Sequence, residues 1–150
     1  PQSLAQVYVH LVFSTANREP FLRDGEIRRQ VYRYMHGICR NVGSPAFRIN
    51  GTADHVHLLC RLGKQSPVSD LVRDVKRSSS RWLGETDLLA TPFHWQKGYG
   101  AFSTGSTELS QLIRYVDNQE AHHRRVSFKE EFRKLCEENG MIIDERYVWD

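Results

Sequence analysis

The order of β-like and α-like segments constrains the fold of this chain more than any other feature. Four short segments are rich in β-branched and aromatic residues, as strands are, and four longer ones repeat apolar residues at helical spacing. The expected strands are residues 6–15, 47–52, 55–62 and 99–104. The expected helices run from Asp24 to about Val42, from Ser66 to about Gly84, onward from Ser106, and from about Ser127 to Asn139. This order predicts an α+β fold of the ferredoxin-like split βαβ type, with a mostly antiparallel sheet and an additional C-terminal helix.

Capping residues support the first three helix starts. Asp24, Ser66 and Ser106 each precede an apolar stripe and can accept a hydrogen bond from a backbone N–H of the first helical turn. Pro67 is preorganised for such a turn, and Gly43 is a natural helix stop. We therefore expect helices that begin at these three positions.

The length and charge of the chain are compatible with one domain and with an anionic partner. A chain of 150 residues suits a single core, so we expect one domain over residues 1–150. Residues 1–126 hold 17 Lys and Arg against 11 Asp and Glu, whereas residues 127–150, the expected acidic helix and tail, hold 4 against 7. The basic body permits DNA binding without diagnosing it.

Cysteine usage and hydropathy indicate where the protein works. Cys39, Cys60 and Cys136 are an odd number at wide spacing, which fits neither a disulfide framework nor a zinc motif, so we expect reduced core thiols. No apolar run approaches the ~20 residues needed to span a bilayer. We expect a cytoplasmic protein with no membrane partner.

The densest chemical signal is the pair His55 and His57 in an expected strand. Because side chains alternate along a strand, both imidazoles project from one face, while Val56, Leu58 and Cys60 project from the other. Two neighbouring imidazoles on a rigid strand can bind a metal ion. They can equally be two strand histidines that hydrogen-bond to their neighbours.

A second candidate pair lies in the helix expected after Ser106. Tyr115 and Gln119 are four residues apart, so on one helix they share a partly exposed face. Gln119 can offer a carbonyl oxygen to an ion held by His55 and His57, which would place the Tyr115 hydroxyl one turn away. Alternatively, Tyr115 only packs at the border of the hydrophobic core, and Gln119 is exposed to solvent.

These residues together resemble a known family. The HVH motif after Asp54, the downstream YVDNQ and the opening VYVHLVFSTANREPFL are similar to the single-tyrosine HUH transposases of the insertion-sequence-200-like type. The likeness continues through KRSSSRWL, HWQKGYGAFS and NQEAHHRRVSFKEEF to the closing DERYVWD, and so covers nearly the whole chain.

The resemblance implies both a chemistry and a partner. It assigns His55, His57 and Gln119 as ligands of Mg²⁺ or Mn²⁺ and Tyr115 as the nucleophile, with imidazole making Mn²⁺ the easier occupant. It implies cleavage and rejoining of single-stranded DNA at hairpin-bearing ends through a 5′-phosphotyrosine link, with no nucleotide cofactor. It also implies a homodimer in which the tyrosine helix of one subunit completes the site of the other, although spacing leaves cis and trans completion open.

Other residues fit supporting roles less specifically. Basic side chains of the second expected helix and of the segment after the tyrosine helix can contact phosphates or simply be solvated. They are Arg73, Lys76, Arg77, Arg81, Arg124 and Arg125. Trp95, Tyr99 and Phe102 can stack on bases but are more typical of a core, and His122 and His123 are expected at the surface.

Two other functions compete with this hypothesis. Histidine-triad nucleotide hydrolases also alternate histidines on a strand, but their third histidine falls where this chain has Leu59, which excludes them. A domesticated or repeat-associated relative that binds or processes chromosomal hairpins would keep the same residues, so it stays open.

Overall fold

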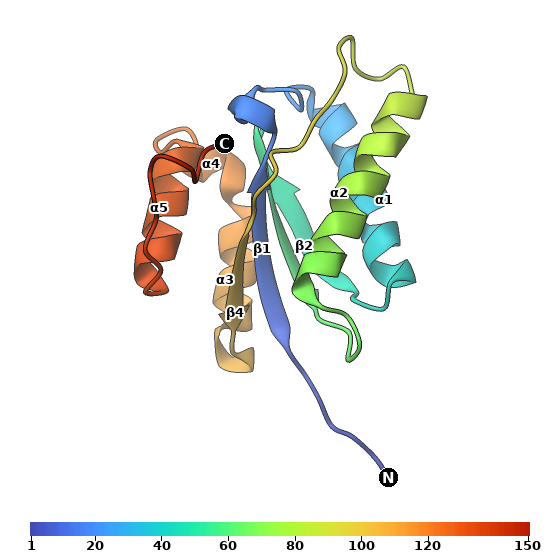
Figure 1. The fold of residues 1–150 in the computed structure, drawn as a ribbon, viewed down its shortest axis with the longest axis vertical. Helices are drawn as coiled ribbons and strands as arrows, with labels where there is room; N and C mark the ends of the chain where they lie inside the picture. Colours follow the sequence, from blue (N-terminus) through green and yellow to red (C-terminus); the bar gives the residue numbers. More distant parts are fainter.

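Four strands form a single antiparallel sheet in a computed structural model of the protein, which describes all residues 1–150. The strands are β1 (Tyr8–Ser14), β2 (Ala46–Gly51), β3 (His55–Arg61) and β4 (Gly100–Thr104). The helices are α1 (Gly25–Asn41), α2 (Val68–Glu85), α3 (Leu109–Asp117), α4 (Gln119–His122) and α5 (Phe128–Glu138). The strand order β2-β3-β1-β4 and the alternation of elements confirm the ferredoxin-like arrangement (Figure 1).

Helices α1 and α2 cover one face of the sheet and build the larger core there (Figure 1). Leu11 and Phe13 of β1 and Leu58 of β3 point into this core, as the two-residue period of a strand requires. The Asp24 side chain caps α1 by accepting hydrogen bonds from two backbone N–H groups of the first turn, as predicted.

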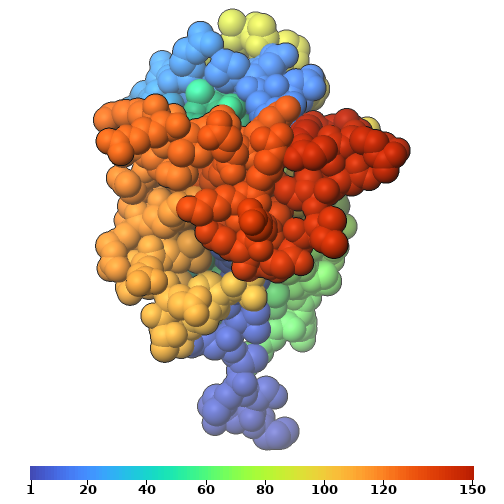
Figure 2. Space-filling view, turned by 90° about the vertical axis from the view of Figure 1, so that its left-hand side faces the viewer, coloured from blue at the N-terminus to red at the C-terminus, as the bar shows by residue number.

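The opposite face of the sheet is covered by α3, α4, α5 and the C-terminal segment. Val12 of β1 and Phe102 of β4 pack there against apolar residues of α5 in a smaller core. Figure 2 shows this side of the molecule, where the orange and red C-terminal segments form most of the surface. Helix α5 therefore covers part of this face of the sheet.

Two predicted helix starts are wrong. Helix α2 begins at Val68 with Pro67 as its cap, and the Ser66 hydroxyl donates to the Val42 carbonyl oxygen instead. After Ser106 the chain first makes a 3-10 turn, so α3 begins only at Leu109 and has no side-chain cap. Ser66 is thus used in a contact with a distant residue, whereas Ser106 lies inside a 3-10 turn in which the Glu108 N–H donates to the Gly105 carbonyl oxygen.

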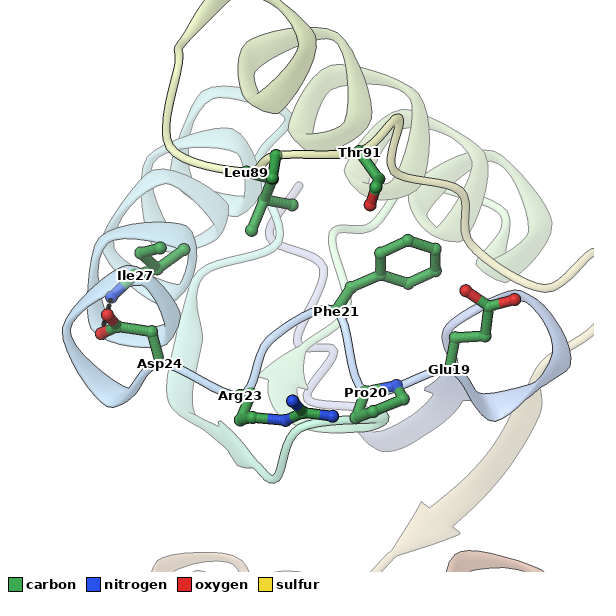
Figure 3. A pocket seen from close by; sticks show the side chains of 9 residues that line it. Glu19, Pro20, Phe21, Arg23, Asp24, Ile27, Leu89 and Thr91 are labelled. Carbon is green, nitrogen blue, oxygen red and sulfur yellow. Dashed lines mark hydrogen bonds between the residues drawn. The ribbon is translucent and has the colours of Figure 1, made fainter.

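The remaining features of the fold are consistent with the sequence. All three cysteines are free and buried, as expected. No helix combines the length and apolar character required to span a bilayer. A cavity of about 430 Å³ lies between the turn that precedes α1 and residues 89–91, with Phe21 and Leu89 on its wall (Figure 3). It gathers no histidine and lies apart from the chemistry described below.

Replacing Gly51 with alanine should destabilise the protein by about 1–3 kcal/mol or more, because the new Cβ would lie 2.1 Å from the backbone oxygen of His55. Gly37→Ala is the control, since nothing lies within 4 Å of its added Cβ in α1 and helix propensity favours alanine by about 0.5–1 kcal/mol. Urea unfolding measures both. Equal midpoints for the two variants would contradict the tight approach at Gly51.

Candidate active site

His55 and His57 lie side by side on the sheet face that α5 covers. Alternation along β3 sends Val56 and Leu58 into the core under α1 and α2 and leaves both imidazoles on the other face, as predicted. Both histidine side chains are fully buried rather than open to solvent. The predicted pairing is therefore correct, but the site is enclosed.

A carboxylate from α5, that of Glu131, fills the space in front of these imidazoles. Its Oε1 lies 2.8 Å from Nε2 of His57, 3.0 Å from Nε2 of His123 and 3.5 Å from Nε2 of His55. Its side chain is 2% exposed. Three imidazole nitrogens therefore converge on one buried carboxylate oxygen.

The other oxygen of Glu131 faces the predicted nucleophile. The Tyr115 hydroxyl donates to Oε2, and Nε2 of Gln119 donates to the same oxygen at 3.1 Å. The Gln119 carbonyl oxygen is turned toward Nε2 of His55, 3.1 Å away. His55, His57, Tyr115 and Gln119, which the sequence analysis identified, thus gather around Glu131, which it did not identify.

The helix that carries Tyr115 does not continue unbroken to Gln119, contrary to the prediction. Helix α3 ends at Asp117, and α4 begins at Gln119 after Asn118, whose backbone is no longer helical. The backbone N–H of Asn118 still bonds to carbonyls of the preceding turn, so the two side chains remain on one side. Gln119 is fully buried, not on a partly exposed flank.

Outer partners hold the imidazole rings. Nδ1 of His55 lies 2.8 Å from Oδ1 of Asp54, and Nδ1 of His123 lies 2.6 Å from the Val126 carbonyl oxygen. Nδ1 of His57 lies 2.8 Å from Nε2 of His10, a residue of β1. Such second partners orient metal-binding imidazoles in proteins.

Burial and the Glu131 charge set the protonation states. Burial lowers the pKa of His57 to about 4 and the pKa of His10 to about 3, so both rings are neutral at pH 7. Burial alone raises the pKa of Glu131, but hydrogen bonds from His123 and His57 outweigh it and hold this pKa well below its ordinary value. Burial and then the Glu131 charge raise the pKa of Tyr115 well above its ordinary value. The phenol is therefore neutral in this arrangement.

The donor atoms fit a divalent ion. One ligand atom from each of His55, His57, His123 and Glu131 lies within 4.8 Å of the others. Two ligands of one ion at bond lengths of about 2.0–2.2 Å lie at most about 4.4 Å apart, so these side chains need only a small inward shift to share one ion. Neutral imidazole and carboxylate are ordinary ligands of such ions. The chain therefore has a cluster that suits a divalent metal.

Tyr115 is reached from solvent through a cavity of about 500 Å³ between β4, α3 and α5. Glu108, Glu130 and Glu138 line it, with Lys134 as the one basic residue of its wall. A phosphodiester entering here meets a negative wall, so positive charge at the histidine cluster is needed to attract it.

The predicted phosphate-binding residues divide into separate groups. Arg73, Lys76 and Arg77 of α2 line a groove of about 450 Å³ together with Trp95 and Tyr99. This groove lies on the α2 side of the sheet, across from the histidines. The other three predicted residues, Arg81, Arg124 and Arg125, are exposed and outside this groove.

Lys76 differs from its neighbours in the groove. Its Nζ donates to the carbonyl oxygens of Gln96 and Gly98 at 2.7 and 2.6 Å, and it lies over the Phe13 ring. Burial lowers its pKa to about 8. The contacts of this lysine attach the segment before β4 to α2, which is a structural role. Of the aromatic candidates, Phe102 is buried in the core as expected, whereas Tyr99 is exposed.

Sequence reasoning missed three residues of the site: His10, His123 and Glu131. His123 was expected at the surface, but it faces Glu131. Glu131 was counted only as part of an acidic helix. It sits three residues after Phe128 and one before Phe132, on the apolar stripe of α5, and a carboxylate on a buried stripe was the available signal.

Comparisons with known proteins agree with this fold. Residues 3–119 match the family model described as Transposase IS200 like. A solved protein assigned as a transposase from Deinococcus radiodurans R1 is similar over 79% of this chain and 95% of its own, with a TM-score of 0.62 and 21% identity. A REP-associated tyrosine transposase, solved bound to a REP hairpin, is similar over 84% of this chain and 74% of its own, with a TM-score of 0.60 and 14% identity. No curated protein matches the sequence. Because the family model spans most of the chain, the protein belongs to the IS200-like transposase family.

Proposed function

We propose that this transposase cleaves and rejoins single-stranded DNA at hairpin-bearing ends, with Tyr115 as the nucleophile. The observation that carries the proposal is the convergence of the Tyr115 hydroxyl, Gln119 and the imidazoles of His55 and His57 on one buried point. A phenol beside a set of metal ligands is an arrangement that suits attack on a phosphodiester.

The chain's residues support each part of the reaction. The Tyr115 oxygen attacks the scissile phosphorus, the bond from phosphorus to the 3′ oxygen breaks, and the strand before the cut leaves with a free 3′-hydroxyl. The Tyr115 proton already points to Oε2 of Glu131, which is placed to accept it. Attack of a 3′-hydroxyl on the 5′-phosphotyrosine reverses these steps, so rejoining needs no ATP.

His55, His57 and Gln119 would hold the Mg²⁺ or Mn²⁺ ion of the proposed reaction. When bound, the ion supplies positive charge that polarises the phosphoryl oxygens. Asp54 and His10 keep the two imidazoles oriented toward it. The closed sheet face excludes water around these residues, which strengthens every charge interaction there.

The direct test incubates the protein and Mn²⁺ or Mg²⁺ with labelled single-stranded DNA that carries a hairpin, and looks for a protein–DNA adduct that survives denaturation. We expect an adduct on the single strand and none on the fully paired duplex of the same sequence. Absence of an adduct across a panel of hairpin ends would overturn the proposal.

The groove beside α2 is the proposed path of the DNA backbone. Arg77 is 60% exposed in its side chain, and its ion pair with Asp74 is at the surface, so it is available to a phosphate. Arg77→Ala should weaken binding of hairpin DNA and reduce the slope of log affinity against log salt by about 0.7–0.9, the value for one lost phosphate contact. Arg40→Ala is the control, because Arg40 is exposed on α1 and does not line the groove. Equal slopes for both variants would remove Arg77 from the DNA path.

A second candidate is a repeat-associated enzyme that processes chromosomal hairpins without moving an element. The likeness to a transposase solved on a REP hairpin favours it. The adduct assay separates the two when it compares hairpins from an element end with palindromic repeats from the same genome. Preference for the chromosomal repeats would select this second function.

A further inference from the structure

We infer that Glu131 and His123 are ligands of the metal ion, so that the site is built from three imidazoles and a carboxylate rather than from His55, His57 and Gln119 alone. The inference rests on the proposed function, because it concerns the same ion. It adds two ligands and gives the C-terminal helix a direct part in metal binding.

The ring orientations provide the first argument. A carboxylate and a backbone carbonyl can only accept hydrogen bonds, so the Nδ1 atoms of His55 and His123 must carry the protons that bind Asp54 and Val126. With Nδ1 used in this way, the Nε2 atom of each ring is the one that can offer its lone pair to a metal ion. Both Nε2 atoms face the Oε1 atom of Glu131, at 3.5 and 3.0 Å.

Lone pairs that face one another repel unless a proton or a metal ion lies between them. The Gln119 carbonyl oxygen adds another acceptor, since it lies 3.1 Å from Nε2 of His55 while the amide group of Gln119 donates to Glu131. One ion among these atoms removes the conflict at once. His57 completes the set when its Nδ1 donates to His10, which leaves its Nε2 free as a ligand.

Charge balance provides the second argument. Glu131 is almost fully buried, and all four of its ion-pair partners are histidines, with no Lys or Arg among them. A buried carboxylate without a fixed cation is costly, and so is a buried divalent ion surrounded only by neutral ligands. When Glu131 binds the ion, each charge compensates the other.

The two oxygens of Glu131 contact different groups. Oε1 faces the imidazoles, and Oε2 accepts from the Tyr115 hydroxyl. Glu131 would thus link the metal ion to the Tyr115 hydroxyl. It lies three residues after Phe128, the first residue of α5, so this helix positions both oxygens. Three imidazoles with one carboxylate suit Mn²⁺ better than Mg²⁺, which prefers oxygen ligands.

The test measures Mn²⁺ affinity without DNA, from the loss of the free-ion electron paramagnetic resonance signal on titration with protein. Glu131→Gln and His123→Ala should each weaken Mn²⁺ binding by at least about tenfold, the lower end for loss of even an outer-shell partner. Glu137→Gln, an exposed carboxylate of the same helix, and His94→Ala, an exposed histidine that does not contact Glu131, should bind Mn²⁺ as the wild type does.

Each outcome decides a separate question. Unchanged affinity in both Glu131→Gln and His123→Ala would overturn the enlarged ligand set while leaving the proposed function intact. Tighter binding by Glu131→Gln would show that the carboxylate competes with the ion, which also overturns the inference. A wild-type protein that binds no Mn²⁺ would instead refute the metal-assisted function itself. Circular dichroism checks folding, and His123→Ala carries the test if Glu131→Gln does not fold.

Discussion

Tyr115→Phe should eliminate the covalent protein–DNA adduct, with a loss of cleavage on the order of 10⁶-fold, the scale seen when an enzyme loses its nucleophile. The substitution removes one oxygen and leaves the ring, which contacts His10 and His57 edge-on at centroid distances of 6.4 and 5.7 Å. Packing of α3 therefore survives, and binding of hairpin DNA should change little. Tyr147→Phe is the control, because Tyr147 is exposed in the C-terminal segment.

The position of the label makes this experiment specific for the proposed chemistry. A 5′-phosphotyrosine link leaves the protein on the strand that follows the cut, so a label at the 3′ end should migrate with the protein. A label at the 5′ end should appear on a shorter free strand that ends in a 3′-hydroxyl. The opposite distribution, or an adduct that survives Tyr115→Phe, would refute the assignment of Tyr115.

The parts of the structure that were predictable are those fixed by local periodicity. The two-residue period of β3 places His55 and His57 on one face whatever surrounds the strand. Asp24 caps α1 because the acceptor and the two N–H groups are within three residues of one another. The order of the elements was sufficient to predict the ferredoxin-like arrangement, because few topologies join them with short connections.

The missed parts depend on contacts between distant residues. Glu131 meets His57 across 74 positions of the chain, and His10 meets His57 across 47. In the sequence Glu131 is one of several carboxylates in an acidic helix, and net charge conceals which of them is buried. Its place on the apolar stripe of α5 separates it from the exposed Glu130, but only the register of α5 against the sheet shows which histidines it meets.

The acidic C-terminal region therefore has a structural role in the site that its net charge does not indicate. Its net charge offset the basic body, but its helix closes the histidine face of the sheet and brings a carboxylate to the nucleophile. A truncation before α5 would expose His55 and His57 and remove the acceptor of the Tyr115 hydroxyl. The region acts as a component of the site in this arrangement.

Mixing two inactive variants should fail to restore cleavage, because each chain holds its own complete site in this structure. The Tyr115 hydroxyl is bound to Glu131 of the same chain, and that carboxylate contacts His57 of the same chain. Loss of either the tyrosine or a histidine then inactivates the chain that carries it. The pair to co-express, with different tags, is Tyr115→Phe and His55→Ala, each also paired with wild-type chain as a positive control. We expect an adduct only in the two controls.

The sequence resemblance favours the opposite outcome, a homodimer in which the tyrosine helix of one subunit serves the histidines of the other. In that arrangement the adduct would reappear in the mixture, and it would form on the His55→Ala chain, which keeps Tyr115. Such a result would require α3 and α4 to exchange between the two subunits, so that the hydrogen bonds of Tyr115 and Gln119 to Glu131 and the one from Asn50 to the Val116 carbonyl form across the dimer. Completion within one chain makes the same bonds without an exchange of helices between subunits, so it is the arrangement that we expect the mixing experiment to report.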